Sequence, residues 1–444
     1  MSRPNPISGF PEFLPQGRLV EARVLQLLAQ HFELHGFAPI ETRAVEPLSQ
    51  LSRKGEIDKE IYVIRRLHAE PDAKAELGLH YDLTVPFARY VLERSGHLSF
   101  PFRRYQIQKV WRGERPQEGR YREFTQADID VIGQNTLAAH HDAEIALVAL
   151  DVFAALESEI GIPPVKLHLN NRKLAEGFYA GLEIADPAAV LQRIDKLGKI
   201  GAEAVAELLR RDLGLSDAQI TACLRLATIN SSDLSFVAEV KALGVSHELL
   251  DQGVAELADL MAAVSQGATG RAVVDLSIAR GLDYYTGTVY ETFLTGAEAL
   301  GSVASGGRYD SLASDGKVSF PGVGYSIGVT RLLAPLINAG KITASRSVPS
   351  VVLVAVDDEP HRGSANEVAA SLRRRGIAAE VAPKAAKFGK QITYAEKRGI
   401  PYVWFGAGYD DSVKDLASRQ QTPADPANWE PAEAHRYVSF AAMS

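Results

Sequence analysis

Two alternating segments on either side of an arginine-rich loop constrain the fold of this chain more than any other feature. Polar and aromatic side chains recur at every second position, at Gln106 and Gln108 before the loop and at Phe124, Gln126, Asp128 and Asp130 after it. Successive side chains of a β-strand point to opposite faces, so this period of two predicts an antiparallel hairpin. Pro116 and Gly119 are typical turn residues at its tip.

The polar face of this hairpin has two explanations. Buried carboxylates and amides need partners, and a bound ligand would supply them to Gln126 and Asp130. The alternative is a solvated hairpin at the edge of a sheet. The stripe mixes aromatic and polar residues instead of the Lys, Glu and Thr of a solvated face. This composition favours the ligand.

A second polar cluster follows much later in the chain. Residues 280–291 read RGLDYYTGTVYE, which combines a fixed cation, paired tyrosines and a strand-forming run, and residues 306–310 read GGRYD. Such a lining suits a small polar substrate and a phosphate group. A buried ion pair beneath a sheet explains the same residues about as well, and this stretch alone does not decide between them.

Two shorter segments carry related signals. In residues 79–90, LHYDLTVPFARY, the two-residue spacing of Asp82 and Thr84 predicts that they share one face of a strand. In residues 322–333, GVGYSIGVTRLL, a glycine-rich strand leads into a helix that carries Arg331 near its start. Small residues let a flat ligand approach the backbone, and a guanidinium group stacks on rings or pairs with phosphate.

The bulk composition bounds the remaining possibilities. A length of 444 residues corresponds to roughly three domains. The lone Cys223 cannot form an intramolecular disulfide and fits a reducing cytoplasm, and no apolar run reaches the length of about 20 residues that a membrane span needs. The net charge is −7, so a nucleic-acid partner requires a local basic patch. Basic residues between positions 373 and 398 are a candidate, although a solvated helix face is the commoner explanation.

Helical and strand signals are unevenly distributed along the chain. A helix is predicted over residues 20–32, and residues 172–270 show helical periodicity without strand alternation. From residue 351 onward strands and helices alternate, which predicts a small α/β domain with a mostly parallel sheet. No clear element is predicted after Gln421.

Taken together, these segments resemble the class II aminoacyl-tRNA synthetases, and specifically the histidyl-tRNA synthetase family. The 111–133 hairpin resembles motif 2 of the class, the 322–333 segment resembles motif 3, and RGLDYY and GGRYD resemble two strings peculiar to the family. The likeness extends to LNNRKLAEG at 169–177, IDKLGKIG at 194–201, KFGKQITYAEKRGIPYVWFG at 387–406 and KDLASRQQ at 414–421. It therefore covers nearly the whole chain.

The resemblance implies an α+β fold with three parts. Residues 1–171 and 266–340 would form a class II catalytic domain on an antiparallel sheet, residues 172–265 a helical insertion, and residues 348–444 an α/β anticodon-binding domain. The implied enzyme is a histidine–tRNA ligase of the cytoplasm that works as a homodimer. It would activate L-histidine with ATP and Mg²⁺ to histidyl-adenylate and transfer histidine to the 3′ end of tRNA(His). Motif 1, at 36–47, departs from the family by having Arg43 where proline is usual.

The family motifs assign roles to individual residues. Arg280 and Arg112 would be catalytic, with Arg280 bridging the histidine carboxylate and the α-phosphate. The histidine site would comprise Asp82, Thr84 and Gln126 at the amino group, Asp130 and Tyr285 at the ring nitrogens, Tyr284 beside them, and Arg280. The ATP site would comprise Arg112 at the α-phosphate, Glu114 and Phe124 around the adenine, and Arg331 over its other face. The motifs identify no metal ligand on the protein.

Two other kinds of protein are alternatives. A non-catalytic, synthetase-like regulatory subunit of ATP phosphoribosyltransferase tends to lose the arginine of RGLDYY, other motif residues and the C-terminal domain. A histidine-sensing or tRNA-binding module with a dead site, which is a different class of protein, would have a broken set of cations. This chain keeps Arg280, Arg112 and Arg331 together with the α/β tail, so the sequence favours the ligase.

Overall fold

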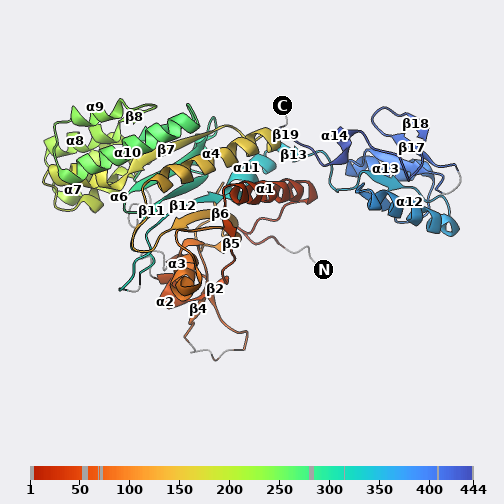
Figure 1. The fold of residues 1–444 in the computed structure, drawn as a ribbon, viewed down its shortest axis with the longest axis horizontal. Helices are drawn as coiled ribbons and strands as arrows, with labels where there is room; N and C mark the ends of the chain where they lie inside the picture. The colour runs from red at the N-terminus through yellow and green to blue at the C-terminus, as the bar shows by residue number, and fades with distance from the viewer. Residues whose placement is uncertain are drawn as a thin grey trace. The chain divides into compact units, whose positions relative to one another are not determined.

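The computed structural model describes residues 5–52, 59–68, 70, 74–279, 285–314, 316–407 and 410–442. Two of the predicted site residues, Arg280 and Tyr284, lie outside these ranges. The chain divides into two compact units (Figure 1), each described by itself. Unit 1 comprises Met1–Pro11, Leu25–Ser158 and Pro163–Pro335, and unit 2 comprises Glu12–Val24, Glu159–Ile162 and Leu336–Ser444.

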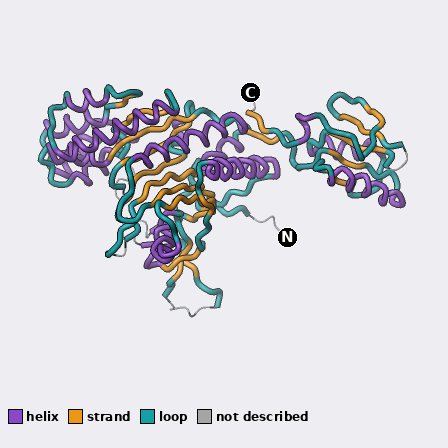
Figure 2. The backbone as a smooth tube through the Cα atoms, viewed as in Figure 1, coloured by secondary structure: helices purple, strands orange, loops and turns teal. Residues whose placement is uncertain are grey.

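A nine-stranded sheet forms the centre of unit 1 (Figure 2). Its order is β1 (Ala38–Pro39), β5 (Phe102–Trp111), β6 (Glu123–Ile132), β12 (Gly322–Gly328), β11 (Ala304–Tyr309), β10 (Thr288–Leu294), β7 (Val165–Asn171), β9 (Ala272–Asp275) and β8 (Asn230–Ser231). The run from β5 to β7 is antiparallel throughout, and the pairs β1–β5 and β7–β9 are parallel. The predicted α+β class with an antiparallel sheet is confirmed.

The predicted hairpin is the pair β5–β6. Its register aligns Trp111 with Glu123 and Phe102 with Ile132, and the arginine-rich loop joins the two strands. β6 also pairs with β12, so it is an interior strand and is buried at every position from Thr125 to Ile132. A solvated edge hairpin is therefore excluded.

The segment around Asp82 differs from the prediction of a strand. The nearest strand, β4 (Leu77–Leu79), ends earlier and pairs with β2 (Val45–Pro47) and β3 (Val63–Ile64), while Thr84 begins helix α3 (Thr84–Arg94). The Asp82 carboxylate accepts a hydrogen bond of 3.0 Å from the backbone N–H of Val85. Proline is tolerated in a first helical turn, so Pro86 does not oppose the helix. The local capping chemistry outweighs the two-residue spacing.

Helices make up most of the remainder of unit 1, and the first helix of the chain belongs to unit 2 up to Val24 and to unit 1 from Leu25 onward. Helix α1 (Pro15–Leu34) contains the predicted residues 20–32, and α2 (Leu48–Leu51) and α4 (His140–Ile160) accompany it. The 172–265 region folds into α5 (Arg172–Gly181), α6 (Pro187–Ile194), α7 (Leu197–Leu213), α8 (Asp217–Ala227), α9 (Phe236–Lys241) and α10 (Glu248–Gly267). A Cβ atom on Gly253 would lie 2.1 Å from the backbone nitrogen of Leu174, so α5 and α10 cross in close contact. The short strand β8 was not predicted.

The C-terminal region of unit 2 alternates strand and helix as predicted. Its five-stranded sheet has the order β15 (Ala379–Val381), β14 (Val352–Val354), β16 (Tyr402–Phe405), β17 (Ser412–Asp415) and β18 (Gln421–Pro423). The first three strands are parallel and the last two antiparallel. Helices α12 (Arg362–Arg374) and α13 (Phe388–Arg398) are the crossovers, and α11 (Val329–Asn338) precedes the region.

The chain after Gln421 is more ordered than its sequence indicates. It forms α14 (Glu433–Arg436) and β19 (Phe440–Ala442), and β19 pairs antiparallel with β13 (Ile342–Ala344). Proline and alanine dominate this stretch, so neither local periodicity nor propensity marks the elements. Long-range pairing with β13 supplies the order instead.

Two further predictions concern the whole chain. No helix in the described part of the chain combines the length and the apolar composition that a membrane crossing requires. Cys223 is fully buried in α8, and burial raises the pKa of its thiol to about 12. A thiol with such a pKa is almost entirely protonated at neutral pH, so Cys223 is an inert filler of the helical core.

Candidate active site

Two adjoining cavities lie on the polar face of the nine-stranded sheet. The larger has a volume of about 350 Å³ and the smaller a volume of about 100 Å³. They share a boundary formed by Arg112, Gln126, Tyr285, Ser305 and Ser326. Segments that are far apart in sequence therefore meet in one continuous depression.

The smaller cavity contains the described residues of the predicted histidine site. Asp82 lies at the start of α3, Gln126 and Asp130 lie on β6, and Thr84 and Tyr285 complete the set. Gln126 and Asp130 are four positions apart on one strand, so both point to the same face. The structure thus brings together five side chains that the sequence assigned to one ligand.

Asp130 is held by two buried partners. Arg104 on β5 approaches it with 2.5 Å between Nη2 and Oδ2, and Tyr309 on β11 donates its hydroxyl proton to Oδ1 over 2.7 Å. The Arg104 guanidinium also lies 4.2 Å from the centroid of the Phe87 ring. Arg104 was not predicted as a site residue, although it continues the alternating face of Gln106 and Gln108 by one step.

A glycine makes room for the Asp130 carboxyl group. A Cβ atom on Gly324, the residue paired with Asp130 across the sheet, would lie 2.0 Å from Oδ1. Such a contact is far inside van der Waals separation, so a side chain at position 324 would displace the carboxylate. The glycine-rich character of β12 is therefore a direct requirement of this site.

Asp128 is a second buried carboxyl group on the same face, and no role for it was predicted from the sequence. It accepts a hydrogen bond of 2.5 Å from Ser326 Oγ, which in turn accepts one of 2.8 Å from Gln126 Nε2. Burial raises the pKa of Asp128 to about 7, because Asp130 and Asp82 add to the effect of desolvation and Arg104 only partly opposes it.

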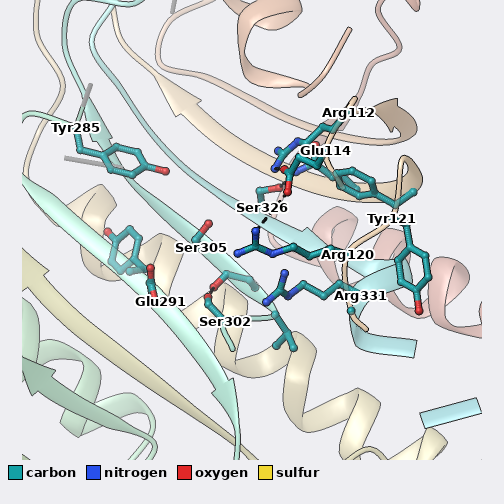
Figure 3. A pocket seen from close by; sticks show the side chains of 17 residues that line it. Arg112, Glu114, Arg120, Tyr121, Tyr285, Glu291, Ser302, Ser305, Ser326 and Arg331 are labelled. Carbon is teal, nitrogen blue, oxygen red and sulfur yellow. Dashed lines mark hydrogen bonds and ion pairs between the residues drawn. The ribbon is translucent and has the colours of Figure 1, made fainter. Parts of the chain in front are cut away.

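The larger cavity contains all of the residues predicted to bind ATP. Arg112 and Phe124 face each other across the hairpin, with 5.1 Å between the guanidinium carbon and the ring centroid. Arg331 on α11 donates from Nη2 to the carbonyl oxygen of Leu300 over 2.5 Å. Glu114 in the loop lies 3.8 Å from Arg112. Figure 3 shows Arg112 and Arg331 on one side of this cavity.

Two charged residues that line the larger cavity were not predicted as site residues. Arg120 in the loop lies 3.4 Å from the Glu114 carboxylate, and Glu291 on β10 lies across the cavity, on the same side as Tyr285 (Figure 3). Arg120 belongs to the arginine-rich tip, so the charge of that loop was its signal. Glu291 lies in a run of strand-forming residues, and its sequence does not distinguish it from a solvated position.

The two cavities differ in the charge of their linings. Arg112, Arg120 and Arg331 outnumber Glu114 and Glu291 in the larger one, so it suits a polyanion. Among the described residues, the smaller one is lined by the carboxyl groups of Asp82, Asp128 and Asp130 and by a single cation, Arg112, which it shares with the larger one. It suits a ligand that carries positive charge or several hydrogen-bond donors. Arg112 stands where the two linings meet.

One depression on the antiparallel sheet is lined by a hairpin that carries arginine, a glycine-rich strand and an arginine on the helix that follows this strand. This combination defines a class II aminoacyl-tRNA synthetase. Comparison with known proteins identifies the family. Residues 9–332 match the family model for histidyl-tRNA synthetase, and residues 350–405 match the model for an anticodon-binding domain. The chain belongs to the histidyl-tRNA synthetase family, and its function is that of a histidine–tRNA ligase.

The similarity to individual relatives extends over nearly the full length. The chain is 61% identical over 441 residues to the histidine–tRNA ligase of Cutibacterium acnes and 57% identical over 449 residues to that of Micrococcus luteus, with 97% of each chain covered in both cases. Among solved structures, the histidyl-tRNA synthetase of Nostoc sp. PCC 7120 has a TM-score of 0.84 at 34% identity, covering 96% of this chain and 97% of that one.

Proposed function

We propose that the smaller cavity holds L-histidine and the larger one holds ATP, so that the two substrates meet at Arg112. The sizes and charges of the linings support this arrangement, because the larger cavity is basic and the smaller one is acidic. The position of Arg112 on the boundary of both cavities carries the proposal. A guanidinium there contacts the α-phosphate and lies close to the carboxylate that attacks it.

The first step is adenylation of the amino acid. The histidine carboxylate attacks the α-phosphorus of ATP, a new O–P bond forms, and pyrophosphate leaves with the electrons of the broken bond. Both reactants are anions, so positive charge arranged in advance does the catalytic work and no protein nucleophile is needed. Arg112 supplies this charge from the hairpin, and we expect Arg280, which lies outside the described residues, to supply more.

Histidine recognition follows from the hydrogen-bonding groups of the substrate. Its ammonium group donates, and its neutral ring has one donor and one acceptor nitrogen. Asp82, Thr84 and Gln126 accept from the ammonium, and Asp130 and Tyr285 pair with the ring nitrogens. A site built to pair with a polar ring rejects apolar isosteres by roughly 10⁴–10⁵. Tyr284 is assigned beside the ring by sequence and lies outside the described residues.

ATP enters as its magnesium complex. Phe124 and Arg331 enclose the adenine, and Glu114 lies at its edge. Magnesium prefers oxygen ligands and usually keeps several from phosphate and water. With Glu114 assigned to the adenine, Glu291 is the other described carboxylate that lines the larger cavity, and it is the residue that would hold the ion. The described residues contain no group of three or more acidic, histidine or cysteine side chains suited to a metal.

The second step transfers histidine to the 3′ end of tRNA(His), in the cytoplasm and within a homodimer. The C-terminal α/β region is assigned to the anticodon, and its exposed Lys384, Lys387 and Lys390 lie near the start of α13. In the motif 1 segment, Arg43 pairs with the buried Glu46 over 3.1 Å, and Glu46 also binds Arg89. Arg43 thus has a partner within its own chain.

The regulatory-subunit alternative has a structural counterpart. A protein described as an ATP phosphoribosyltransferase regulatory subunit/histidyl-tRNA synthetase from Bacillus halodurans has a TM-score of 0.73 at 17% identity, covering 89% of this chain. That likeness concerns the fold alone. Arg112, Arg120 and Arg331, which line the larger cavity, support the ligase instead.

Histidine-dependent exchange between ATP and labelled pyrophosphate tests the proposal. The purified protein should catalyse exchange with histidine and not with the other amino acids. Arg280→Ala should abolish exchange while histidine binding, followed by calorimetry, is only weakened. Binding of histidine without any exchange by the unmodified protein would support the regulatory alternative. Unchanged exchange by the variant would remove Arg280 from its assigned role.

A further inference from the structure

Asp128 is a buried carboxyl group beside the histidine cavity, and the reaction described above gives it no task. It lies on β6 between Gln126 and Asp130, two residues from each, so all three side chains share one face of the strand. Only 2% of its surface is exposed, and it lines the smaller cavity. Burying a carboxyl group is costly, which makes a position without a function difficult to explain.

A chain of two hydrogen bonds connects Asp128 to Gln126. Ser326 Oγ donates to Asp128 Oδ1, and Gln126 Nε2 donates to Ser326 Oγ. A serine hydroxyl has a single proton, so Ser326 can only accept from Gln126 once it has donated to Asp128. The NH₂ group of Gln126 must therefore face Ser326, and its carbonyl oxygen is turned away.

The carbonyl oxygen of Gln126 is the open end of this chain. Oε1 is buried and accepts no hydrogen bond from any residue that the structure describes. Gln126 lines both cavities, so a ligand held there lies next to its side chain. A buried acceptor without a partner costs free energy until a ligand satisfies it.

We infer that Asp128 is a positioning residue which, through Ser326, holds the amide of Gln126 with its oxygen presented to the α-ammonium group of histidine. The inference rests on the proposed function, because the ammonium is the donor that Gln126 Oε1 would accept from. With a neutral side chain at position 128, Ser326 is free to donate its proton to Gln126. The amide can then turn over and present its NH₂ group, which repels an ammonium.

The groups that face Asp128 set the pH range in which this arrangement exists. Burial is the main reason that the pKa of Asp128 is raised to about 7. Arg104 on β5 favours the carboxylate, Asp130 on β6 and Asp82 before α3 oppose it, and the Ser326 hydroxyl on β12 favours it. The carboxylate therefore forms as the pH rises through about 7 and is lost below that pH.

The test compares Asp128→Asn with the unmodified enzyme in histidine-dependent exchange over a range from about pH 6 to 9. At about pH 8 the variant should raise the KM for histidine roughly tenfold, as expected for one lost oriented hydrogen bond, and leave the KM for ATP unchanged. The ratio of the two KM values should approach one at about pH 6, where the native carboxyl is protonated. The titration of the substrate histidine affects the KM of the variant and of the native enzyme alike, so it cancels in their ratio.

A double-mutant cycle tests the route through Ser326. After Ser326→Ala, the further change Asp128→Asn should leave the KM for histidine as it was, because the connection is already broken. If Asp128→Asn does not fold, the KM of Ser326→Ala relative to native enzyme should show the same pH dependence. Glu157→Gln, which alters a partly exposed ion pair with Arg271 away from the cavity, is the matched control.

The possible failures are separable. A KM ratio that stays constant with pH, or additive effects of the two substitutions, would overturn the role of Asp128. In either case exchange by the unmodified enzyme would leave the proposed function standing. Absence of histidine-dependent exchange in the unmodified enzyme would instead overturn the proposed function, and the inference with it.

Discussion

The guanidinium group of Arg104 and the carboxylate of Asp130 form an ion pair, with 2.5 Å between Nη2 and Oδ2, in which both side chains are buried. The pair fixes the acidic end of the histidine cavity. Its partners lie on adjacent strands in directly paired positions. The pairing register between β5 and β6 therefore determines that Asp130, which lines the smaller cavity, lies opposite Arg104.

Arg104→Met should destabilise the enzyme strongly, because it leaves the buried Asp130 without its cation. Breaking one partner of a buried pair commonly costs about 3–5 kcal/mol. Chemical denaturation followed by fluorescence measures the change. Arg103→Met is the matched control, because the pair Arg103–Glu144 is partly exposed and should be worth about 1 kcal/mol or less. Equal losses from the two variants would contradict the assignment.

Gly324→Ala should abolish histidine binding while much of the fold survives. The added methyl group would occupy the position of Asp130 Oδ1, so the carboxylate must move away from the ring nitrogens. Calorimetric titration with histidine measures the loss. Gly363→Ala, in α12, has no atom within 4 Å of the added Cβ and should leave histidine binding intact. Native-like affinity in Gly324→Ala would mean that Asp130 does not bind the substrate.

Arg112→Ala should lower the rate of pyrophosphate exchange by about 10²–10³, the usual effect of removing one stabilising donor from a transition state. Arg112→Lys should recover only part of this rate, because an ammonium group lacks the planar fork of the guanidinium. Steady-state exchange at saturating histidine and ATP is the measurement. A variant that changes only the KM for ATP would place Arg112 in ground-state binding instead.

The stability of the free enzyme should depend on pH through Asp128. Its pKa in the folded protein is about 7, against an ordinary value of 3.8, so the folded state holds the proton more tightly than the unfolded one. Ionisation therefore costs stability progressively as the pH rises from about 4 to 7. Asp128→Asn lacks this cost, so its Tm relative to the native enzyme should increase between about pH 5 and pH 8. A constant difference would show that Asp128 does not titrate in this range.

Charge reversal in the C-terminal region should separate tRNA binding from amino-acid activation. Arg373 to Arg375 precede β15 and Lys384 to Lys390 follow it, so the basic run of the sequence is divided between opposite ends of that strand. Lys387→Glu should raise the KM for tRNA(His) in aminoacylation and leave pyrophosphate exchange unchanged. Arg374→Glu makes the same change at the other end. Insensitivity of the tRNA KM to both variants would remove the basic run from tRNA binding.

Sequence patterns predicted the parts of the fold in which local signals and tertiary pairing agree. The period of two around residues 106–130 gave the β5–β6 hairpin, and the glycines of 322–328 gave a strand that ends in a helix. The same logic was wrong at Asp82 and Thr84. There, the first turn of α3, in which the Val85 N–H donates to the Asp82 side chain, outweighs a two-residue spacing that is too short to distinguish a strand from a helix start.

Residues that act through other residues were harder to predict. Arg104 supports Asp130, and Ser326 connects Asp128 to Gln126, but neither relation is visible until β5, β6 and β12 are aligned. The motif resemblance located the side chains assigned to the substrates. It gave no information on the residues that hold those side chains in position. The β13–β19 pair is a similar case, because 95 or more intervening residues separate strands of only three residues each.

That short pair has a practical consequence for the region that it encloses. Because Ala344 aligns with Phe440, the polypeptide enters and leaves the α/β region at neighbouring points. A module with adjacent ends can be transplanted, circularly permuted or interrupted at its junction with little strain on its interior. Exchanging residues 345–439 between relatives should therefore transfer the module as one piece, provided that both short strands stay with the recipient.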